Sequence, residues 1–335
     1  MKLCIFGAGA IGAYLGACLT AGGRDEVVLV ARGTRCAAMR GDGVRIQRAG
    51  RAAQAVAVAC TDSPRSLPTQ DVVFLTTKAH DAPSAAHEVA ALLGPETTVV
   101  TAMNGVPWWY FADLTGPHRG ATLRSVDPGG ILKDAILASR VVGAVVWTAA
   151  TMVEPGVVQV REAMRLALGE PSGADTERLR HIRAALEATG VEVVTTRDIR
   201  AEVWLKLWGN LAFNPVSVLT RATLSGIARD PGGRAAVRAM MVEAEAVAHA
   251  LGVRFPVDVD QRISMAEGIG PHPTSSLQDL DAGKAVELAA LSGAVLEMAA
   301  LVGVATPTLA LVHGLAQLRV RDIVPQANVG AITSR

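Results

Sequence analysis

The chain has 335 residues, of which 50% are hydrophobic and 19% are charged, and its formal net charge is +1. This composition excludes a disordered chain, and the length favours two domains with substantial cores. Basic residues are spread along the chain and its 4 cysteines form no CxxC motif, so we expect no nucleic-acid partner, no metal and reduced thiols in a cytoplasmic protein.

A glycine motif follows the first apolar run, where the chain reads KLCIFGAGAIG. Gly7, Gly9 and Gly12 have the G-x-G-x-x-G spacing of a dinucleotide-binding turn between a strand and a helix. Gly7 would allow the tight turn, Gly9 the approach of a pyrophosphate, and Gly12 close packing of the helix. The amides at the helix start, with Ala10 and Ile11, would then face the phosphates. The alternative is a glycine-rich turn without a ligand.

The next predicted strand, EVVLVAR, bears on the choice of cofactor. NAD enzymes usually end this strand with an acidic residue that binds the ribose hydroxyls. Here the strand ends at Arg32, while Asp25 and Glu26 stand at its other end. Because a guanidinium can bind a phosphate through two charge-assisted bonds, the sequence favours NADPH. A solvated loop arginine is the alternative.

Further strand-like runs indicate a mostly parallel, doubly wound sheet. They are GVRIQ, QAVAVAC, DVVFLTTK and TTVVTAMNG, with a helical stretch SAAHEVAALLG before the last. Lys78 and Asn104 each follow the carboxyl end of a predicted strand, which is the edge where such sheets bind ligands. A solvated lysine and a simple turn residue remain the alternatives for these two positions.

The character of the chain changes near residue 197. Before that point it still reads as strands and one helix, and after it long helical patterns dominate. We therefore predict a Rossmann-like domain over residues 1–196 and a helical domain over residues 197–335, with a ligand site between them. The predicted helices of the second domain are 199–213, 231–252, 257–268, 280–303 and 307–320. We expect no membrane partner, since no run reaches the roughly eighteen apolar residues of a membrane span.

One polar stripe interrupts the most apolar of these helices, which reads EVWLKLWGNLAFNP. Lys206, Asn210 and Asn214 are spaced four apart and so lie on one side of a helix whose remaining faces are apolar. Such a stripe faces either a protein partner or a pocket. The simpler alternative is an ion pair between Glu202 and Lys206, with Asn214 ending the helix before Pro215.

Over nearly its full length the chain resembles the ketopantoate reductase (2-dehydropantoate 2-reductase) family. GAGAIG, TTKAHD, MNGV, RAEVWLKLWGNLAFNP and SSLQDL…GKAVELAALSG occur in the order found in the family. The resemblance implies NADPH-dependent reduction of 2-dehydropantoate to pantoate in pantothenate biosynthesis. Lys206 would be the general acid, because an apolar cleft lowers the pKa of a lysine toward the range useful for proton donation.

The resemblance also implies roles for the other polar residues. Glu287 joins Lys206 as a catalytic residue. The residues implied to hold the 2-oxo acid or its hydroxyl are Asn104, Asn210, Asn214, Ser275 and Glu287. The residues implied to contact the cofactor are Gly7, Gly9, Ala10, Ile11, Gly12, Arg32, Lys78 and Asn104.

Two departures from the family pattern leave the substrate open. The segment 107–140 is longer than in compact members, and an asparagine that some members carry near Thr223 is missing. One alternative is a reductase of another 2-oxo acid. A related hydroxyacid dehydrogenase and an NADPH-binding sensor without turnover are the others. The oligomeric state also stays open, with a homodimer as the candidate.

Overall fold

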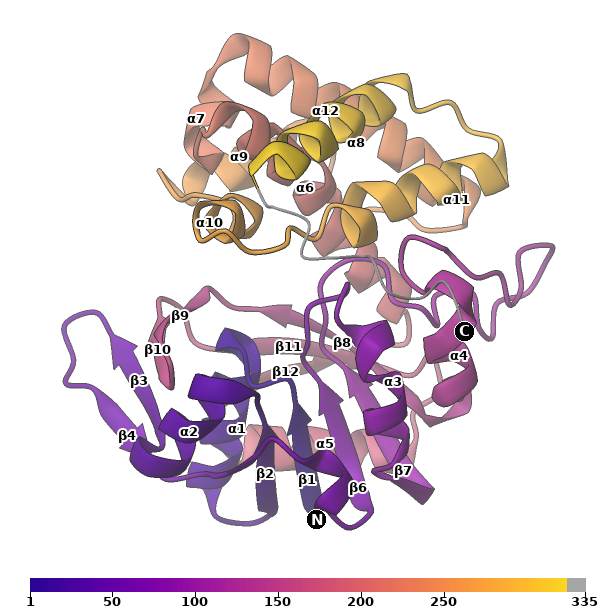
Figure 1. The fold of residues 1–335 in the computed structure, drawn as a ribbon. Helices are drawn as coiled ribbons and strands as arrows, with labels where there is room; N and C mark the ends of the chain where they lie inside the picture. Colours follow the sequence, from indigo (N-terminus) through magenta and orange to yellow (C-terminus); the bar gives the residue numbers. More distant parts are fainter. Residues whose placement is uncertain (324–335) are drawn as a thin grey trace, which may run out of the picture. The chain divides into compact units, whose positions relative to one another are not determined.

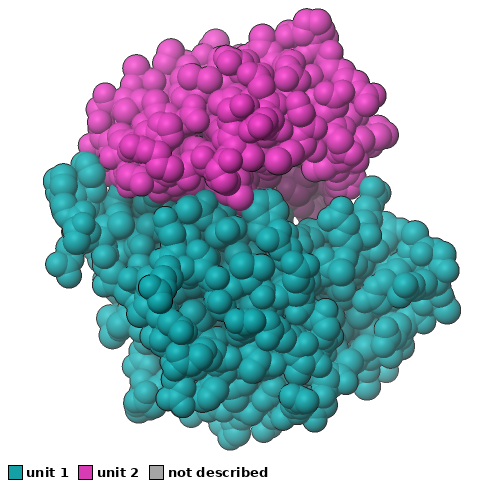
Figure 2. Space-filling view, turned by 180° about the vertical axis from the view of Figure 1, so that it is seen from behind, with its two compact units in different colours: residues 1–203 teal, residues 204–335 magenta. Residues whose placement is uncertain are grey.

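The computed structural model describes residues 1–323. Two compact units make up the chain, residues 1–203 and the residues from 204 onward (Figure 2). The first unit is α/β and the second is helical, which confirms the predicted fold class. Helix α6 (Ile199–Thr220) begins in the first unit and continues into the second. In the part of the chain described, no helix is long and apolar enough to cross a membrane.

An eight-stranded sheet forms the centre of the first unit within the described residues (Figure 1). Neighbouring strands are parallel except at the contact of β8 with β11. The interior strand β1 is a nearly continuous apolar run, as expected where both faces of a parallel sheet are covered. In spatial order the strands are β12 (Glu192–Thr195), β11 (Arg165–Gly169), β8 (Val141–Trp147), β7 (Leu93–Thr101), β6 (Gln70–Leu75), β1 (Lys2–Phe6), β2 (Glu26–Val30) and β5 (Ala59–Thr61).

The order of these strands creates a switch point beside β1. The chain proceeds from β1 to β2 on one side, and β6 later pairs with the other side of β1. Connections from neighbouring strands therefore leave in opposite directions at the carboxyl edge of the sheet. In open α/β sheets this is where ligands bind.

A second, four-stranded sheet was not expected from the sequence. It contains β4 (Gln54–Val56), β3 (Val44–Arg48), β10 (Val157–Val160) and β9 (Ala150–Glu154) in that order within the described residues. The predicted strand QAVAVAC was wrong in this respect, because it divides between the two sheets. The apolar run VVGAVVWTAA (residues 141–150) divides in the same way. The physical reason is the packing of α1, which contacts β2 of the main sheet and β9 and β10 of the smaller one.

The helices of the first unit lie on both faces of the main sheet, with α3 in front of it and α5 behind it in Figure 1. One amphipathic example is α5, which begins with a side-chain cap from Thr176 and buries Leu179, Ile182 and Leu186. The helices are α1 (Ala10–Gly22), α2 (Gly33–Asp42), α3 (Ala82–Ala90), α4 (Ile131–Ala135) and α5 (Glu177–Glu187), with short 3₁₀ turns η1 (Pro64–Ser66), η2 (Pro128–Gly130) and η3 (Ala138–Arg140).

The second unit is helical, and α6 packs there through its two tryptophans. Trp204 and Trp208 are fully buried, and the ring of Trp208 stacks on Phe255 at a centroid distance of 3.9 Å. The indole N–H of Trp208 donates to the carbonyl of Met241 at 2.8 Å, which fixes the rotation of α6. The other helices are α7 (Leu224–Arg229), α8 (Pro231–Ala250), α9 (Val259–Gly268), α10 (Ser275–Asp281), the π-helix η4 (Ala289–Gly293), α11 (Ala294–Val302) and α12 (Pro307–Ile323).

Two helix predictions in this unit were wrong. The predicted helix 280–303 is interrupted, because residues 284–287 are not helical and a π-helical turn precedes α11. The alternative in which Asn214 ends its helix also fails, since α6 continues through Pro215 to Thr220. Proline inside a helix removes one backbone hydrogen bond, and here the close packing of α6 on its neighbours retains the helical path.

Candidate active site

The glycine turn lies at the switch point of the main sheet. Gly7 has φ of 104°, and a β-carbon there would lie 2.7 Å from Thr77 Cγ2. A β-carbon on Gly12 would lie 2.5 Å from the carbonyl oxygen of Gly7 and 2.4 Å from Thr76 Oγ1. Because both positions are closed to larger residues, the turn after β1 packs directly on the segment after β6. The threonines of this segment were not singled out in the sequence, although they lie near the end of the predicted strand DVVFLTTK.

Gly9 differs from its two neighbours in the motif. A β-carbon at this position would come no closer than 4.0 Å to the nearest atom described. Gly9 is the N-cap of α1, and the first amides of a helix lack partners within the helix. The open space therefore borders the amides that begin at Ala10, which is the arrangement that binds a phosphate group.

Arg32 and Lys78 lie at the same edge of the sheet, after β2 and β6 respectively. The Arg32 side chain is 70% exposed, and its Nη2 lies 3.2 Å from a carboxylate oxygen of Glu88 on α3. Exposed ion pairs of this kind contribute only about 0–1 kcal/mol, so the guanidinium can exchange partners at low cost. Lys78 is partly buried. The sequence offered no sign of Glu88, which is distant along the chain.

Asn104 follows β7 and is partly buried beside a small cavity of about 10 Å³. Trp109 borders the same cavity and donates its indole N–H to Thr101 Oγ1 at 2.9 Å. The longer segment 107–140 therefore begins beside the asparagine that the family resemblance singled out.

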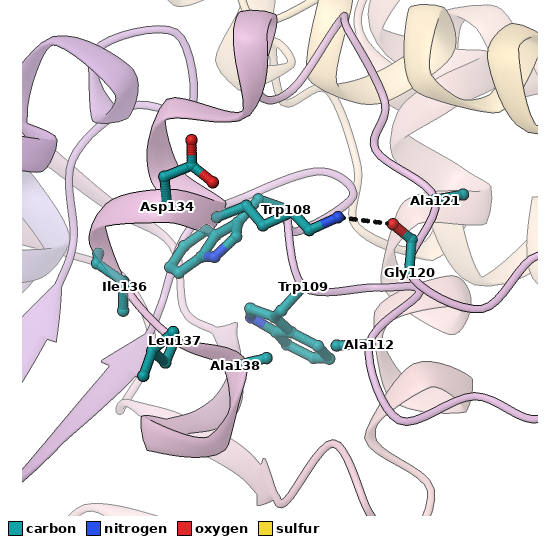
Figure 3. A pocket seen from close by; sticks show the side chains of 10 residues that line it. Trp108, Trp109, Ala112, Gly120, Ala121, Asp134, Ile136, Leu137 and Ala138 are labelled. Carbon is teal, nitrogen blue, oxygen red and sulfur yellow. Dashed lines mark hydrogen bonds between the residues drawn. The ribbon is translucent and has the colours of Figure 1, made fainter.

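The segment 107–140 also encloses a cavity of about 410 Å³ of its own (Figure 3). Trp108 and Trp109 form one wall, and Lys133 Nζ donates to the carbonyl of Gly120 at 2.8 Å across the segment. The indole N–H of Trp108 is buried and has no hydrogen-bond partner among the residues described. Trp109 contacts both cavities, so a change at this residue affects the surroundings of Asn104 as well.

The polar stripe of α6 lies in the second unit apart from its first residues. Lys206 and Asn210 are partly buried, whereas Asn214 is only 4% exposed. The apolar residues beside the stripe, such as Trp204, Leu207 and Leu211, are buried. Access for a small molecule thus decreases along the stripe from Lys206 to Asn214.

Ser275 and Glu287 belong to the same unit but have different surroundings. Ser275 is the exposed first residue of α10. Glu287 is only 5% exposed and lies in the non-helical stretch directly before the π-helix. Glu287 falls inside the predicted helix 280–303, and in the structure this helix is broken at Glu287 and the side chain is buried. Short π-helical turns of this kind occur frequently at functional sites.

Comparison with known proteins agrees with these features. Residues 3–108 match the family model described as Ketopantoate reductase PanE/ApbA, and residues 198–320 match the model for its C-terminal part. A relative from Mesorhizobium japonicum named 2-dehydropantoate 2-reductase is 46% identical over 94% of this chain and 98% of its own.

Solved structures show the same similarity. A crystal structure from Ralstonia solanacearum MolK2, provisionally described as a ketopantoate reductase, has a TM-score of 0.90 and 39% identity and covers 96% of this chain and 98% of its own. A ketopantoate reductase of the PanE/ApbA family from Ralstonia eutropha JMP134 has a TM-score of 0.81 and 30% identity, with 96% and 99% covered. The chain therefore belongs to the ketopantoate reductase family and is an oxidoreductase that acts on a CH–OH/C=O pair.

Proposed function

We propose that the chain reduces 2-dehydropantoate to pantoate with NADPH, and that Lys206 is the general acid. The observation that carries the proposal is the position of Lys206, a partly buried lysine on a helix whose other faces are packed. The name of the Mesorhizobium japonicum relative supports the substrate. The glycine turn and the nearby Arg32 support a dinucleotide with a 2′-phosphate.

Different residues of the chain have different roles in the proposed reaction. NADPH supplies the hydride when it is bound. The amides at the start of α1 hold the pyrophosphate, and Arg32 holds the 2′-phosphate. Lys206 donates a proton to the keto oxygen as negative charge develops there, and the deprotonated amine is reprotonated by solvent. Asn104, Asn210 and Ser275 orient the 2-oxo acid without adding a charge.

A panel of 2-oxo acids tests this proposal. Oxidation of NADPH is followed by absorbance, and 2-dehydropantoate is expected to have the highest kcat/KM of the panel. Linear, branched and aromatic 2-oxo acids serve as competitors. Activity with none of the acids would reject the proposal, and a better substrate than 2-dehydropantoate would change the assignment of the substrate but not of the reaction.

A second candidate is a reductase for a bulkier 2-oxo acid, and one observation favours it. Trp109 borders both the cavity beside Asn104 and the larger cavity of segment 107–140. Replacement of Trp108 and Trp109 by alanine is expected to change the ranking of the 2-oxo acids while NADPH affinity stays nearly the same. An unchanged ranking would remove this candidate.

A further inference from the structure

Arg262 is a partly buried cation in the second unit that the family resemblance did not single out. It lies in the first half of α9, whose start is fixed by a capping box between Asp258 and Gln261. Burial lowers the pKa of the Arg262 guanidinium below its ordinary value, because the charged form loses water contacts. The side chain is therefore held in surroundings that are unfavourable for a charge without a partner.

The guanidinium of Arg262 rests against α6 at Gly209. A β-carbon on Gly209 would lie 2.5 Å from Arg262 Nη2 and 3.0 Å from its Cζ, so only glycine leaves this space to the arginine. Gly209 precedes Asn210 directly and follows Lys206 by three residues. At 3.6 residues per turn, Gly209 lies about 60° from Lys206 around the helix axis and less than one turn further along it. Arg262 therefore packs against the turn of α6 that follows Lys206.

Within the described residues, the guanidinium of Arg262 forms no hydrogen bond and no ion pair. Acidic side chains of the same helix have other partners: Asp260 pairs with Arg234 and Arg238. Glu267 pairs with Arg229. An unpaired cation that is partly removed from water is costly, and an anion bound beside it would offset that cost. No anion of the described chain fills this place.

We propose that Arg262 binds the carboxylate of the 2-oxo acid while Lys206 acts on its keto oxygen. The inference rests on the proposed reduction of a 2-oxo acid. In such a substrate the carboxylate and the keto group are on adjacent carbons. Lys206 belongs to α6 and Arg262 rests against the next turn of the same helix, so the two side chains are candidates for these two groups. The planar guanidinium binds a carboxylate through two parallel hydrogen bonds, which also fixes the plane of the substrate. Arg262 is then a substrate-binding residue that selects acids over neutral ketones.

The principal test is Arg262→Met, which retains most of the side-chain volume and removes the charge. A charge-assisted hydrogen bond typically changes affinity roughly ten- to hundredfold, and the contact with the carboxylate exists before and during the reaction. We therefore expect KM for the acid to increase roughly ten- to hundredfold with kcat changed by less than about threefold. The preference for a 2-oxo acid over the corresponding 2-oxo amide should fall by the same factor, and Arg262→Lys should restore part of it.

Two matched variants separate this role from a structural one. Gly209→Ala places a methyl group where the guanidinium lies, so it should displace the arginine and raise KM in the same direction without lowering the melting temperature. Arg229→Gln removes an exposed arginine of the same unit and should leave KM unchanged. A purely structural arginine would instead make Arg262→Met less stable without altering the preference for acid over amide, and this result would overturn the inference.

Direct binding distinguishes failure of this inference from failure of the proposed reaction. Oxamate, a non-reducible analogue with a carboxylate, is titrated into the NADPH-loaded protein by calorimetry. Weaker binding to Arg262→Met than to the unaltered protein supports the carboxylate site even if no 2-oxo acid of the panel is turned over. Equal oxamate affinity in the two proteins rejects the site even if the reduction of 2-oxo acids is observed.

Discussion

At the carboxyl edge of the main sheet, the groups offered to a ligand belong largely to the backbone, whereas α6 offers side chains. The turn at Gly7 and the first amides of α1 depend on positions where a β-carbon is excluded or would meet empty space. On α6 the lysine and the amides depend on how the bulky neighbours Trp204 and Trp208 orient the helix. A backbone site is thus sensitive to small changes in volume, and a side-chain site is sensitive to loss of a functional group.

The largest expected effect is that of Lys206→Ala. Loss of general-acid catalysis should lower kcat by roughly a hundredfold to ten-thousandfold. The variant should remain folded and bind NADPH, because the proposed cofactor groups lie in the first unit. Steady-state kinetics, circular dichroism and cofactor titration measure the three properties. A folded variant with near-normal turnover of its best 2-oxo acid would exclude the lysine as the proton donor.

Replacing two glycines of the same motif by alanine should affect different properties: Gly12→Ala should lower stability, and Gly9→Ala should lower the affinity for NADPH. Gly12→Ala places a methyl group 2.5 Å from the Gly7 carbonyl oxygen, so it should lower the free energy of unfolding by about 1–3 kcal/mol. Gly9→Ala meets open space and should leave this free energy nearly unchanged while weakening NADPH binding at least tenfold. Urea unfolding and fluorescence titration provide the measurements. Normal NADPH binding by Gly9→Ala would mean that the phosphates lie elsewhere.

Cofactor choice is expected to depend on Arg32 and, to a smaller extent, on Glu88. Arg32→Ala should weaken NADPH binding roughly ten- to hundredfold and NADH binding hardly at all. Glu88→Gln removes the carboxylate that now pairs with Arg32 and should strengthen NADPH binding by less than about fivefold. Arg24→Ala, an exposed change before β2, is the control for overall charge. Equal losses for NADPH and NADH in Arg32→Ala would contradict recognition of the 2′-phosphate.

The smallest effect concerns the pH dependence of stability in the second unit. His313 on α12 is 8% exposed, and its Nδ1 lies 2.7 Å from Ser292 Oγ in the π-helix. Burial lowers the pKa of His313 below its ordinary value of 6.5. As pH falls, the unfolded chain takes up this proton first. The stabilisation is therefore complete above about pH 6.5 and is lost as pH decreases toward the pKa of the folded state.

Unfolding free energies at pH 7.5 and pH 5.5 test the role of this histidine. The decrease between the two pH values should be smaller in His313→Gln than in the unaltered protein. His181→Gln is the matched control, because His181 is 64% exposed on α5. The same decrease in His313→Gln as in the unaltered protein would show that another group is responsible.

Local sequence patterns were sufficient to predict many of the strands and helices of this protein. The apolar run and glycine spacing of residues 2–12 predicted a strand, a turn and a helix, because each depends on neighbouring residues alone. The apolar faces of EVWLKLWGNLAFNP likewise predicted a buried helix with one polar stripe. The end of that helix was not predicted, since the continuation beyond Pro215 depends on what packs against it.

The remaining features of the fold and of the candidate site depend on contacts between segments that are distant in the sequence. Two continuous apolar runs divide between separate sheets because α1 packs against both, and the break before the π-helix buries Glu287. Glu88 beside Arg32 and Arg262 against Gly209 are pairings across 56 and 53 residues of chain. No local periodicity carries such information, because a glutamate or an arginine on an amphipathic helix has the same sequence pattern whether it meets solvent or another helix. The chemical groups and the elements that carry them follow from local sequence, whereas the tertiary structure sets which charged side chains are paired and which are buried.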